Sequence, residues 1–545
     1  MDLEVNLVRV LVVGSGASGV QASLQLLDRG VSVRMIDVGR RPTSPHESLP
    51  LKSFSELRHV DGDQESYFLG RNLDGIRFDD IRTGNKLPPL KSHVIEARSE
   101  TQVADTAGFV LNQSRARGGL AMSWGAGSMP LRAVDLESFP ISLSDLSPYY
   151  DLVADSIGMS GDHDDLAEIV SPPRGLQPPL ELDTPSLRLL ERYQKDRPHW
   201  HRKGLRMGRA WLAVNSIAQA GRDACAYNDM EFWGDADTAV YRPEWTLQEL
   251  ERHSGFEYRG GLEALSFQEA GETVELSVRD TNTGEHSTLT GDAVVLAAAV
   301  PGSPRIALHS MRRFGAEHAV PIRTNPYSYV PCLYLPMLGR PVRDRRCSLA
   351  QLSLLFQAEP DPATAVFSSL FTYRSLLTFK LLNEAPLPYR FGLDVFGALL
   401  PAIVIVTVLH PDLGEGQKRY WIEQGHNGAV RDRVDYRESP EASKRQNTAE
   451  RRLFRTLRRL GLVALKRIRR APGSAIHYSG SLPLSREERP LTCTPEGRLR
   501  PFQRVWIADG SALPIMPAIP PTFTMMAHAR RTADRMVRHL HAANA

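Results

Sequence analysis

The stretch from residue 8 to residue 37 constrains the fold more than any other part of this 545-residue chain. A short run rich in β-branched residues at 8–13 leads directly into Gly-Ser-Gly-Ala-Ser-Gly at 14–19. Small and apolar residues then recur at helical spacing up to Gly30, and a second apolar run at 31–36 ends on Asp37. This order predicts a buried parallel strand, a glycine-rich turn, a helix and a second strand.

The glycine-rich turn has the residue types that a dinucleotide site requires. Gly14 permits a tight turn out of the strand, Gly16 lets the backbone approach a pyrophosphate, and Gly19 allows the helix to pack closely on the sheet. The helix N-terminus at Ala17 and Ser18 then offers N–H groups and a partial positive charge to the diphosphate. We therefore predict that this turn binds the phosphates of a cofactor.

An acidic residue completes the pattern. Asp37 lies eighteen residues past Gly19, where it can accept hydrogen bonds from an adenosine ribose. A GxGxxG motif alone is weak evidence, and a glycine-rich turn of another α/β protein is the alternative. Because strand, helix, strand and acid occur here in order, we favour a cofactor with an ADP moiety, which leaves FAD and NAD both open.

Length and composition place the chain among ordinary globular proteins. The length exceeds what one core supports and suggests two domains, in tandem or with one inserted in the other. The residues are 42% hydrophobic and 24% charged, and the net charge is only +3. So small a net charge argues against a nucleic-acid partner.

The cysteines indicate reduced thiols. Cys225, Cys332, Cys347 and Cys493 are widely spaced and form no CxxC, so we expect neither a metal site nor a disulfide framework. The first predicted strand begins close to Met1 after an acidic start, which leaves no room for a signal peptide. We therefore expect a cytoplasmic protein, with peripheral membrane contact as an open alternative.

Three apolar or basic segments bear on that alternative. Residues 395–409 are apolar but contain Pro401 and fall short of the roughly 20 residues of a bilayer span, so we predict a buried strand over 402–409. Residues 366–382 predict an amphipathic helix that either covers a core or contacts lipid or an apolar substrate. Residues 444–470 predict a basic amphipathic helix, which either packs on a core or binds anionic lipid, phosphate or an acidic partner.

A second glycine cluster follows a polar, weakly periodic region. Gly118 and Gly119 stand a few residues before Trp124, and paired glycines let backbone amides approach a flat or phosphorylated group. The stretch Pro-Ile-Ser-Leu-Ser-Asp-Leu-Ser-Pro-Tyr-Tyr comes next, at 140–150. We expect Ser144 to cap a short helix there.

These motifs together resemble the GMC (glucose-methanol-choline) flavoprotein oxidoreductases, particularly their pyranose-oxidase-like branch. Such proteins carry an N-terminal dinucleotide motif, two glycines before a tryptophan near the flavin, and a stretch similar to residues 141–150. The resemblance implies FAD as the cofactor. In members that bind FAD covalently a histidine precedes the tryptophan, and this chain has Ser123 there, which implies a non-covalent FAD.

The middle of the chain fits the same family. Residues 261–266, 274–279 and 287–290 predict an antiparallel meander with a turn at 282–284. Residues 293–299 predict a buried strand that leads to a short helix through Ser310, as where such chains return to the FAD-binding sheet, with Ala299 in place of the usual glycine. Strand-like runs over 327–335, 348–356 and 402–409 fit a separate sheet-based cap that determines substrate specificity.

The C-terminal residues supply the rest of the implied site. His477 stands in a segment similar to the one whose histidine lies over the flavin ring, and Asp509 ends a predicted strand where the family contacts the ribityl or phosphate region. A helix begins near Thr522, and in the family its N-terminus faces the flavin C2 carbonyl. The cofactor-binding residues that the resemblance implies, beyond the first motif, are Gly118, Gly119, Ser123, Trp124, Asp509, Gly510, Pro521, Thr522 and Phe523.

One residue in this region departs from the family. Hydride transfer from an alcohol to flavin N5 requires a base for the hydroxyl proton, and we predict His477 in that role because the pKa of histidine lies near neutrality. Family members add a second histidine or asparagine before the last helix, where this chain has Pro520, which offers no donor. Either a cap residue substitutes or the chemistry differs. His528, farther along, is expected to pack within the helix.

The sequence thus predicts an α/β protein with an α+β cap: a Rossmann-like FAD-binding domain with an inserted, sheet-based substrate domain. The FAD-binding parts are 1–160, 241–320 and 471–545, with a connecting, substrate-side segment at 161–240 and the cap at 321–470. We favour an FAD-dependent oxidoreductase, an oxidase or a dehydrogenase, acting on the CH–OH group of an alcohol, a sugar, or a natural-product or lipid-linked hydroxyl. A flavoprotein with a non-redox or structural FAD in a biosynthetic step is the alternative. An NAD-dependent dehydrogenase is disfavoured because it gives Asp509 and the last helix no role.

Overall fold

The N- and C-terminal parts of the chain build one parallel sheet. The computed structural model describes residues 9–41, 50–53, 56–57, 60–69, 89–95, 108–232, 234, 236–340, 342, 344–372, 395, 397–425 and 430–544. Within it, a five-stranded sheet has the order β18-β8-β1-β2-β4, and all of its neighbouring strands are parallel. The strands are β1 (Arg9–Val13), β2 (Ser32–Ile36), β4 (Phe256–Arg259), β8 (Ala293–Leu296) and β18 (Val505–Ile507).

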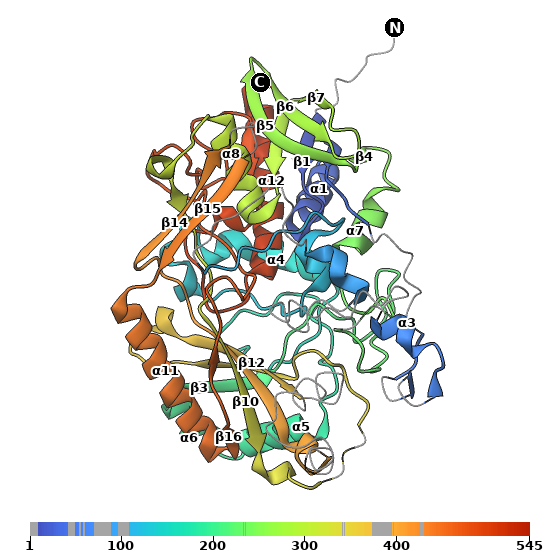
Figure 1. The fold of residues 1–545 in the computed structure, drawn as a ribbon, viewed down its shortest axis with the longest axis vertical. Helices are drawn as coiled ribbons and strands as arrows, with labels where there is room; N and C mark the ends of the chain where they lie inside the picture. The colour runs from blue at the N-terminus through green and yellow to red at the C-terminus, as the bar shows by residue number, and fades with distance from the viewer. Residues whose placement is uncertain are drawn as a thin grey trace.

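Both faces of this sheet are covered, which explains the unbroken apolar run of β1. Val10 and Val12 belong to one buried cluster, and Leu11 and Val13 to another. Helices α1 (Ala17–Asp28) and α12 (Thr522–Asn544) lie side by side in the upper half of Figure 1, although they come from opposite ends of the chain. Helices α4 (Leu143–Ile157) and α7 (Pro243–Leu250) pack on α12 and α1 respectively.

The predicted meander is confirmed. Strands β5 (Leu262–Ala270), β6 (Thr273–Asp280) and β7 (His286–Gly291) form a three-stranded antiparallel sheet. Gly284 in the turn has φ +78°, the left-handed conformation that glycine adopts without strain. The chain then returns through β8 to α8 (Ala299–Ser310), so the predicted strand and helix are confirmed as well.

A second, antiparallel sheet forms the lower half of Figure 1. It has seven strands in the order β16-β10-β13-β12-β11-β3, with β17 also pairing with β10. Strand β3 shows that the segment 161–240 contributes to this sheet as well. The strands are β3 (Leu205–Arg209), β10 (Tyr327–Tyr334), β11 (Leu352–Phe356), β12 (Val366–Thr372), β13 (Ile403–Leu409), β16 (Leu462–Ala464) and β17 (Ile468–Arg469).

Helices cover one face of this seven-stranded sheet, which we call the cap sheet. Leu189 of α5 (Thr184–Gln194), Trp200 of α6 (Arg197–Arg202) and Leu453 of α11 (Pro440–Arg459) belong to one buried cluster with the sheet. The third sheet, β15-β14-β9, lies instead against α8, where Arg305 forms a buried ion pair with Asp432. Its strands are β9 (Val320–Pro321), β14 (Gln417–Gln424) and β15 (Val430–Arg437).

Two helix predictions need correction. Residues 366–372 are not helical but form β12, which pairs with both β11 and β13, because β-branched and aromatic residues favour an extended chain between strands. Residues 373–382 of that prediction lie outside the described part. The basic helix ends at Arg459 rather than at residue 470, because Gly461, at φ +94°, ends it and β16 follows.

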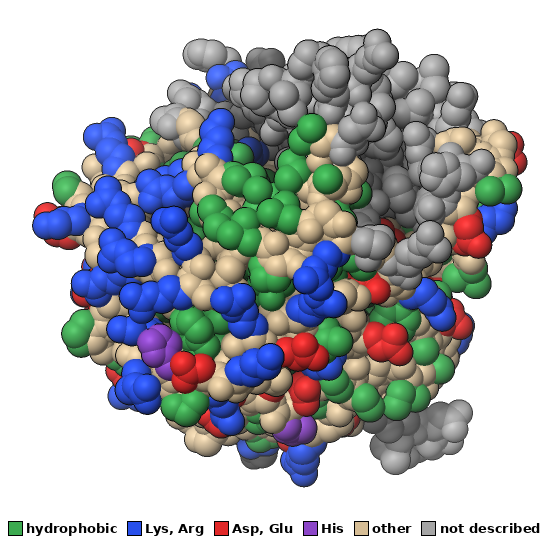
Figure 2. All heavy atoms as spheres, turned by 90° about the horizontal axis from the view of Figure 1, so that it is seen from below, with side chains coloured by type: hydrophobic (Ala, Val, Ile, Leu, Met, Phe, Trp, Pro, Cys, Tyr) green, Lys and Arg blue, Asp and Glu red, His purple; other side chains and the backbone are tan. Residues whose placement is uncertain are grey.

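Two smaller points concern a helix cap and the charged helix. Ser142, not Ser144, caps α4: its hydroxyl accepts a hydrogen bond from Asp145 N at 3.3 Å. Helix α11 buries Leu453 and Leu457 and exposes arginines such as Arg455, so the core-packing interpretation is confirmed for its apolar face. Figure 2, which views the molecule from below Figure 1, shows Lys and Arg side chains gathered on one side of that face. The contact of these basic side chains with lipid or an acidic partner stays a prediction.

Two shorter elements precede the second glycine cluster, helix α3 (Gln64–Leu69) and a 3₁₀ turn over Pro89–Val94. Of the helices in the described ranges, none combines the length and the apolar character that crossing a bilayer would take.

Candidate functional site

The glycine-rich turn has the geometry that the sequence predicts. Gly14 has φ +102°, and a Cβ there would lie 2.7 Å from Ala297 O. A Cβ on Gly19 would lie 1.9 Å from Gly14 O, so the close approach of α1 to β1 requires glycine. At Gly16 the nearest atom to such a Cβ is Gly118 O at 4.0 Å. Gly16 is the N-cap of α1 and has no side chain, which leaves the first N–H groups of the helix for an anion.

Asp37 follows β2 and lies beside this turn. Its carboxylate accepts hydrogen bonds from the Ser15 hydroxyl and, at 3.2 Å, from the Tyr258 hydroxyl. Burial raises the pKa of Asp37 to about 6. A carboxylate that already accepts two hydroxyl donors is suited to accept ribose hydroxyls as well. Neither Ser15 nor Tyr258 was predicted, although Ser15 lies within the motif itself.

The second glycine cluster contacts the first directly. Gly118 N donates to Ser15 Oγ at 2.9 Å, and a Cβ on Gly119 would lie 3.2 Å from Gly16 Cα. Both residues have positive φ, +84° and +63°, which explains the paired glycines. A 3₁₀ turn over Gly119–Ser123 then leads to Trp124, whose Nε1 donates to Tyr241 O at 2.8 Å. The structure thus brings the two predicted glycine segments together.

Asp509 is buried at the end of β18, and its carboxylate contacts protein groups. Ala299 N donates to it at 2.8 Å, Ser511 N donates at 2.8 Å, and the Ser303 hydroxyl donates as well. Ala299 has φ +56°, a left-handed conformation that explains the glycine usual at this position. Burial raises the pKa of Asp509. Asp509 therefore holds the start of α8, and its contact with the flavin stays a prediction.

The predicted base is held by an asparagine that the sequence did not reveal. His477 Nδ1 lies 2.9 Å from Asn325 Oδ1. The Asn325 amide nitrogen donates to His410 O and to Pro517 O, both at 2.8 Å. Because these two carbonyls can only accept, they fix the orientation of the Asn325 amide and turn its oxygen toward the imidazole. His477 must then carry its proton on Nδ1, which makes Nε2 the basic nitrogen.

Several distant segments place this pair. Arg323 and Ser479 exchange backbone hydrogen bonds of 2.9 and 3.0 Å, which aligns the residues around Asn325 with those around His477. Asp412 and Met516 exchange another pair of 2.7 and 3.1 Å. The buried ion pair between Asp412 and Lys418, at 2.6 Å, secures that segment. The cap, the His477 segment and the entrance to α12 therefore meet at one point.

The start of α12 connects the two glycine segments to the place where His477 lies. Helix α12 begins at Thr522, as predicted, and the Phe523 ring stacks on Tyr150 at 5.0 Å between ring centroids. A Cβ on Gly127 would lie 3.8 Å from Pro520 Cγ, so the chain after Trp124 reaches the front of this helix. His528 is fully buried, and burial lowers its pKa to about 3. The prediction that His528 packs within the helix is confirmed.

Comparisons with known proteins agree with this arrangement. The GMC oxidoreductase family model matches residues 424–529, a range that includes His477 and Asp509. The chain is 25% identical to 6'''-hydroxyparomomycin C oxidase of Streptomyces lividus, over 97% of this chain and 91% of that protein.

Two solved structures share the fold. Pyridoxine 4-oxidase from Mesorbium loti has a TM-score of 0.60 at 14% identity, over 97% of this chain and 99% of that one. An FAD-dependent oxidoreductase from Chaetomium thermophilum has a TM-score of 0.60 at 12% identity, with the same coverage. The predicted α/β fold and the family resemblance are confirmed. These matches indicate an oxidoreductase similar to the GMC enzymes.

Proposed function

We propose that His477 is the catalytic base of this enzyme and removes the hydroxyl proton while the CH–OH carbon is oxidised. The observation that carries the proposal is the Asn325 contact, which leaves Nε2 of His477 as the nitrogen able to accept a proton. When bound, FAD would supply the two-electron acceptor for the hydride. Ser123 in the position before Trp124 supports an FAD held without a covalent bond.

The residues around the glycine turn fit the nucleotide end of FAD. Gly16 leaves its backbone open toward the predicted diphosphate, and the N-terminus of α1 offers N–H groups there. Asp37 would accept the ribose hydroxyls, with its carboxylate steadied by Ser15 and Tyr258. These residues would bind and orient the cofactor and take no part in proton transfer.

Asn325 also has a role when the imidazole becomes charged. Once Nε2 takes the proton, both ring nitrogens are donors, and Nδ1–H keeps its hydrogen bond to Asn325 Oδ1. The amide oxygen then stabilises the imidazolium without moving. Since both amide hydrogens of Asn325 are used by His410 O and Pro517 O, Asn325 does not replace the donor lost at Pro520. A residue that takes the place of the usual second side chain would therefore have to be one other than Asn325.

The substrate that we propose is a hydroxylated natural product. The support comes from the relative that the chain matches along most of its length, whose name describes an oxidase of 6'''-hydroxyparomomycin C. Phe232 and Phe371, with ring centroids 5.9 Å apart, join the segment after the second glycine cluster to the cap sheet.

Anaerobic flavin reduction tests the proposal. Purified holoenzyme is mixed with a set of hydroxylated natural products, sugars and simple alcohols, and flavin absorbance is followed without oxygen. We expect a natural-product alcohol to bleach the flavin in the parent enzyme and in His286→Ala, a control at an exposed hairpin residue, but only slowly in His477→Ala.

The same measurements separate the alternatives. Product formation that persists in His477→Ala without flavin bleaching would support a non-redox or structural FAD. A chain that binds no flavin but is titrated by NADH would support an NAD-dependent dehydrogenase. Either result would overturn the proposal.

A further inference from the structure

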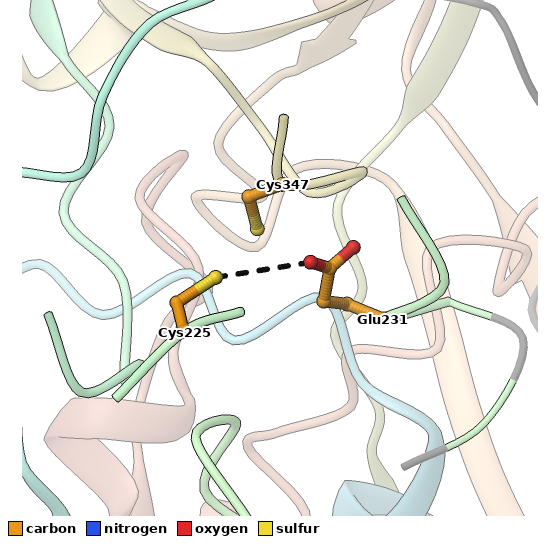
Figure 3. A group of neighbouring side chains, drawn as sticks. All are labelled: Cys225, Glu231 and Cys347. Atoms are coloured by element: carbon orange, nitrogen blue, oxygen red, sulfur yellow. Dashed lines mark hydrogen bonds between the residues drawn. The ribbon is translucent and has the colours of Figure 1, made fainter. Parts of the chain in front are cut away.

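Two residues of one loop, Cys225 and Glu231, meet a distant cysteine, Cys347, in the interior. Figure 3 shows the side chains of Cys225 and Glu231 from one loop and Cys347 from another pointing toward one another. Their two Sγ atoms and a carboxylate oxygen all lie within 4.8 Å of one another, and all three residues are buried. Cys225 Sγ lies 3.8 Å from Glu231 Oε1. Sequence spacing gave no indication of this group, because no two of the cysteines are close along the chain.

Hydrogen bonds from Ser348 orient the Glu231 carboxylate. Glu231 Oε2 accepts hydrogen bonds from Ser348 N and from Ser348 Oγ, each at 2.7 Å. These two donors occupy one carboxylate oxygen and direct the other, Oε1, toward the thiols. Outer contacts of this kind orient the ligands of metal ions in proteins.

The spacing fits a tetrahedral metal ion. With metal–sulfur bonds of about 2.3 Å and metal–oxygen bonds of about 2.0–2.2 Å, sulfur and oxygen ligands lie roughly 3.5–3.7 Å apart. The observed 3.8 Å between Cys225 Sγ and Glu231 Oε1 is close to that value. We propose that Cys225, Cys347 and Glu231 bind a divalent metal ion of the zinc class, with a further ligand completing the tetrahedron.

The chemistry of the three side chains fits such an ion. Thiolate sulfur and carboxylate oxygen are ligands of zinc in proteins, and binding would release the thiol protons. The neighbouring Arg346 guanidinium is paired with Asp229 at 2.8 Å and with Asp183 at 3.5 Å, so its charge is already matched by other carboxylates.

The ion would join the flavin-side segment to the cap. Glu231 precedes Phe232, whose ring packs on Phe371 of β12 and lies 3.7 Å from a Cβ built on Gly125. Cys347 and Ser348 lead into β11 of the cap sheet. The loop between Cys225 and Glu231 includes Tyr227 and Asp229 in left-handed conformations, strain that a metal bond would offset. The role that follows is structural, since none of the three ligands belongs to the His477 site.

Metal analysis of the holoenzyme tests this proposal. The protein is purified without chelators and with thiols reduced, and elemental analysis by mass spectrometry measures zinc per chain. We expect about one zinc per chain in the parent protein and in Cys332→Ser, and at least about a tenfold lower content in Cys225→Ser/Cys347→Ser and in Glu231→Ala. Cys332 is the matched control because it is also buried but forms no such group with the described residues.

A second measurement does not depend on the variants folding. Chelation should lower the Tm of the parent protein, and added zinc should restore it, whereas flavin content stays constant. Cobalt(II) added to the chelated protein should give a thiolate-to-cobalt band in the difference spectrum. A reduced parent protein with no metal, no cobalt band and no change in Tm would overturn the proposal, and so would a Cys225–Cys347 disulfide found by intact mass.

Discussion

The nucleotide end and the imidazole end of this enzyme are built in different ways. At the nucleotide end, β1, the turn at 14–19, α1 and Asp37 follow one another in the chain, and residues such as Gly118, Gly119 and Tyr258 join them from elsewhere. At the imidazole end, His477, Asn325, His410 and Pro517 come from distant positions and meet through single hydrogen bonds. The first region has several overlapping contacts, whereas the second depends on one side chain, Asn325, so we expect it to tolerate substitution less well.

The largest effect should follow from removing the base. His477→Ala should lower kcat/KM by about 10²–10⁴-fold, because a positioned general base contributes that much, while the flavin content remains that of the parent. Steady-state rates and the absorbance of bound flavin measure both quantities. His286→Ala, at an exposed hairpin residue, is the control. A variant that kept parental kcat/KM would contradict the assignment of His477.

A smaller but diagnostic effect should follow from releasing the imidazole. Asn325→Ala removes the acceptor of the Nδ1 proton, so either nitrogen can carry it, and we expect kcat to fall by about 10- to 100-fold. The pH profile of kcat should also shift, which mere loss of packing would not produce. Asn282→Ala, in the turn of the meander, should change neither rate nor profile. An unaltered pH profile would show that Asn325 has no positioning role.

At the nucleotide end we expect weaker and pH-dependent effects. Asp37→Asn should weaken FAD binding by roughly 1–2 kcal/mol, or about tenfold, and leave kcat normal at saturating FAD. Because burial raises the pKa of Asp37 from 3.8 to about 6, the carboxyl of the flavin-free protein is protonated below that pH. FAD affinity should therefore fall as the pH drops through about 6 in the parent and stay nearly constant in Asp37→Asn, as measured by flavin fluorescence. An affinity that rose toward low pH in the parent would contradict this.

Protonation of Asp37 also changes the free energy of unfolding, and the raised pKa determines the direction of that change. The folded flavin-free chain holds the Asp37 proton up to about pH 6, whereas the unfolded chain releases it near 3.8. The stabilising contribution of the protonated Asp37 carboxyl is therefore complete below about pH 4 and is lost as the pH rises through 6. Denaturant unfolding of flavin-free protein across that range, compared with Asp37→Asn, checks the direction.

The smallest effect concerns the backbone that joins the two ends. Ala299 has φ +56°, so Ala299→Gly should relieve strain and raise the free energy of unfolding by roughly 0.5–1 kcal/mol. Ala298, with φ −83°, is unstrained, so Ala298→Gly should instead lower stability. Thermal unfolding of the two holoenzyme variants measures the contrast. Equal responses would show that the left-handed alanine carries no strain.

The contrast between the two ends also explains what the sequence could predict. The strand, turn, helix and acid around Gly14 follow from local periodicity and from the conformational needs of glycine, and all were predicted at nearly their observed bounds. The helix expected over residues 366–382 was wrong for 366–372 because pairing with β11 and β13 decides the conformation there. No local pattern distinguishes these two outcomes for an apolar run.

The parts of the candidate site that the sequence did not predict were missed for the same reason, because tertiary contacts determine them. Asn325 is an ordinary polar residue before a strand, and only tertiary contacts with residues such as His410 and Pro517 show that its amide is oriented. The cluster of Cys225, Glu231 and Cys347 is likewise invisible in the sequence, because its members approach through loops rather than through a spaced motif. Sites whose residues are brought together only by the tertiary fold cannot be predicted from local sequence patterns.

The pairing of α1 with α12 constrains how this polypeptide can be divided. Helix α12 follows the entrance to the His477 site, and α1 begins at the glycine turn, yet Arg530 of α12 donates to Gln21 of α1 at 2.7 Å and the two helices share one buried cluster. A protein cut anywhere between them would leave each fragment with an uncovered sheet face. Neither fragment is therefore expected to be an independent unit, and a split enzyme would regain function only by reassociating.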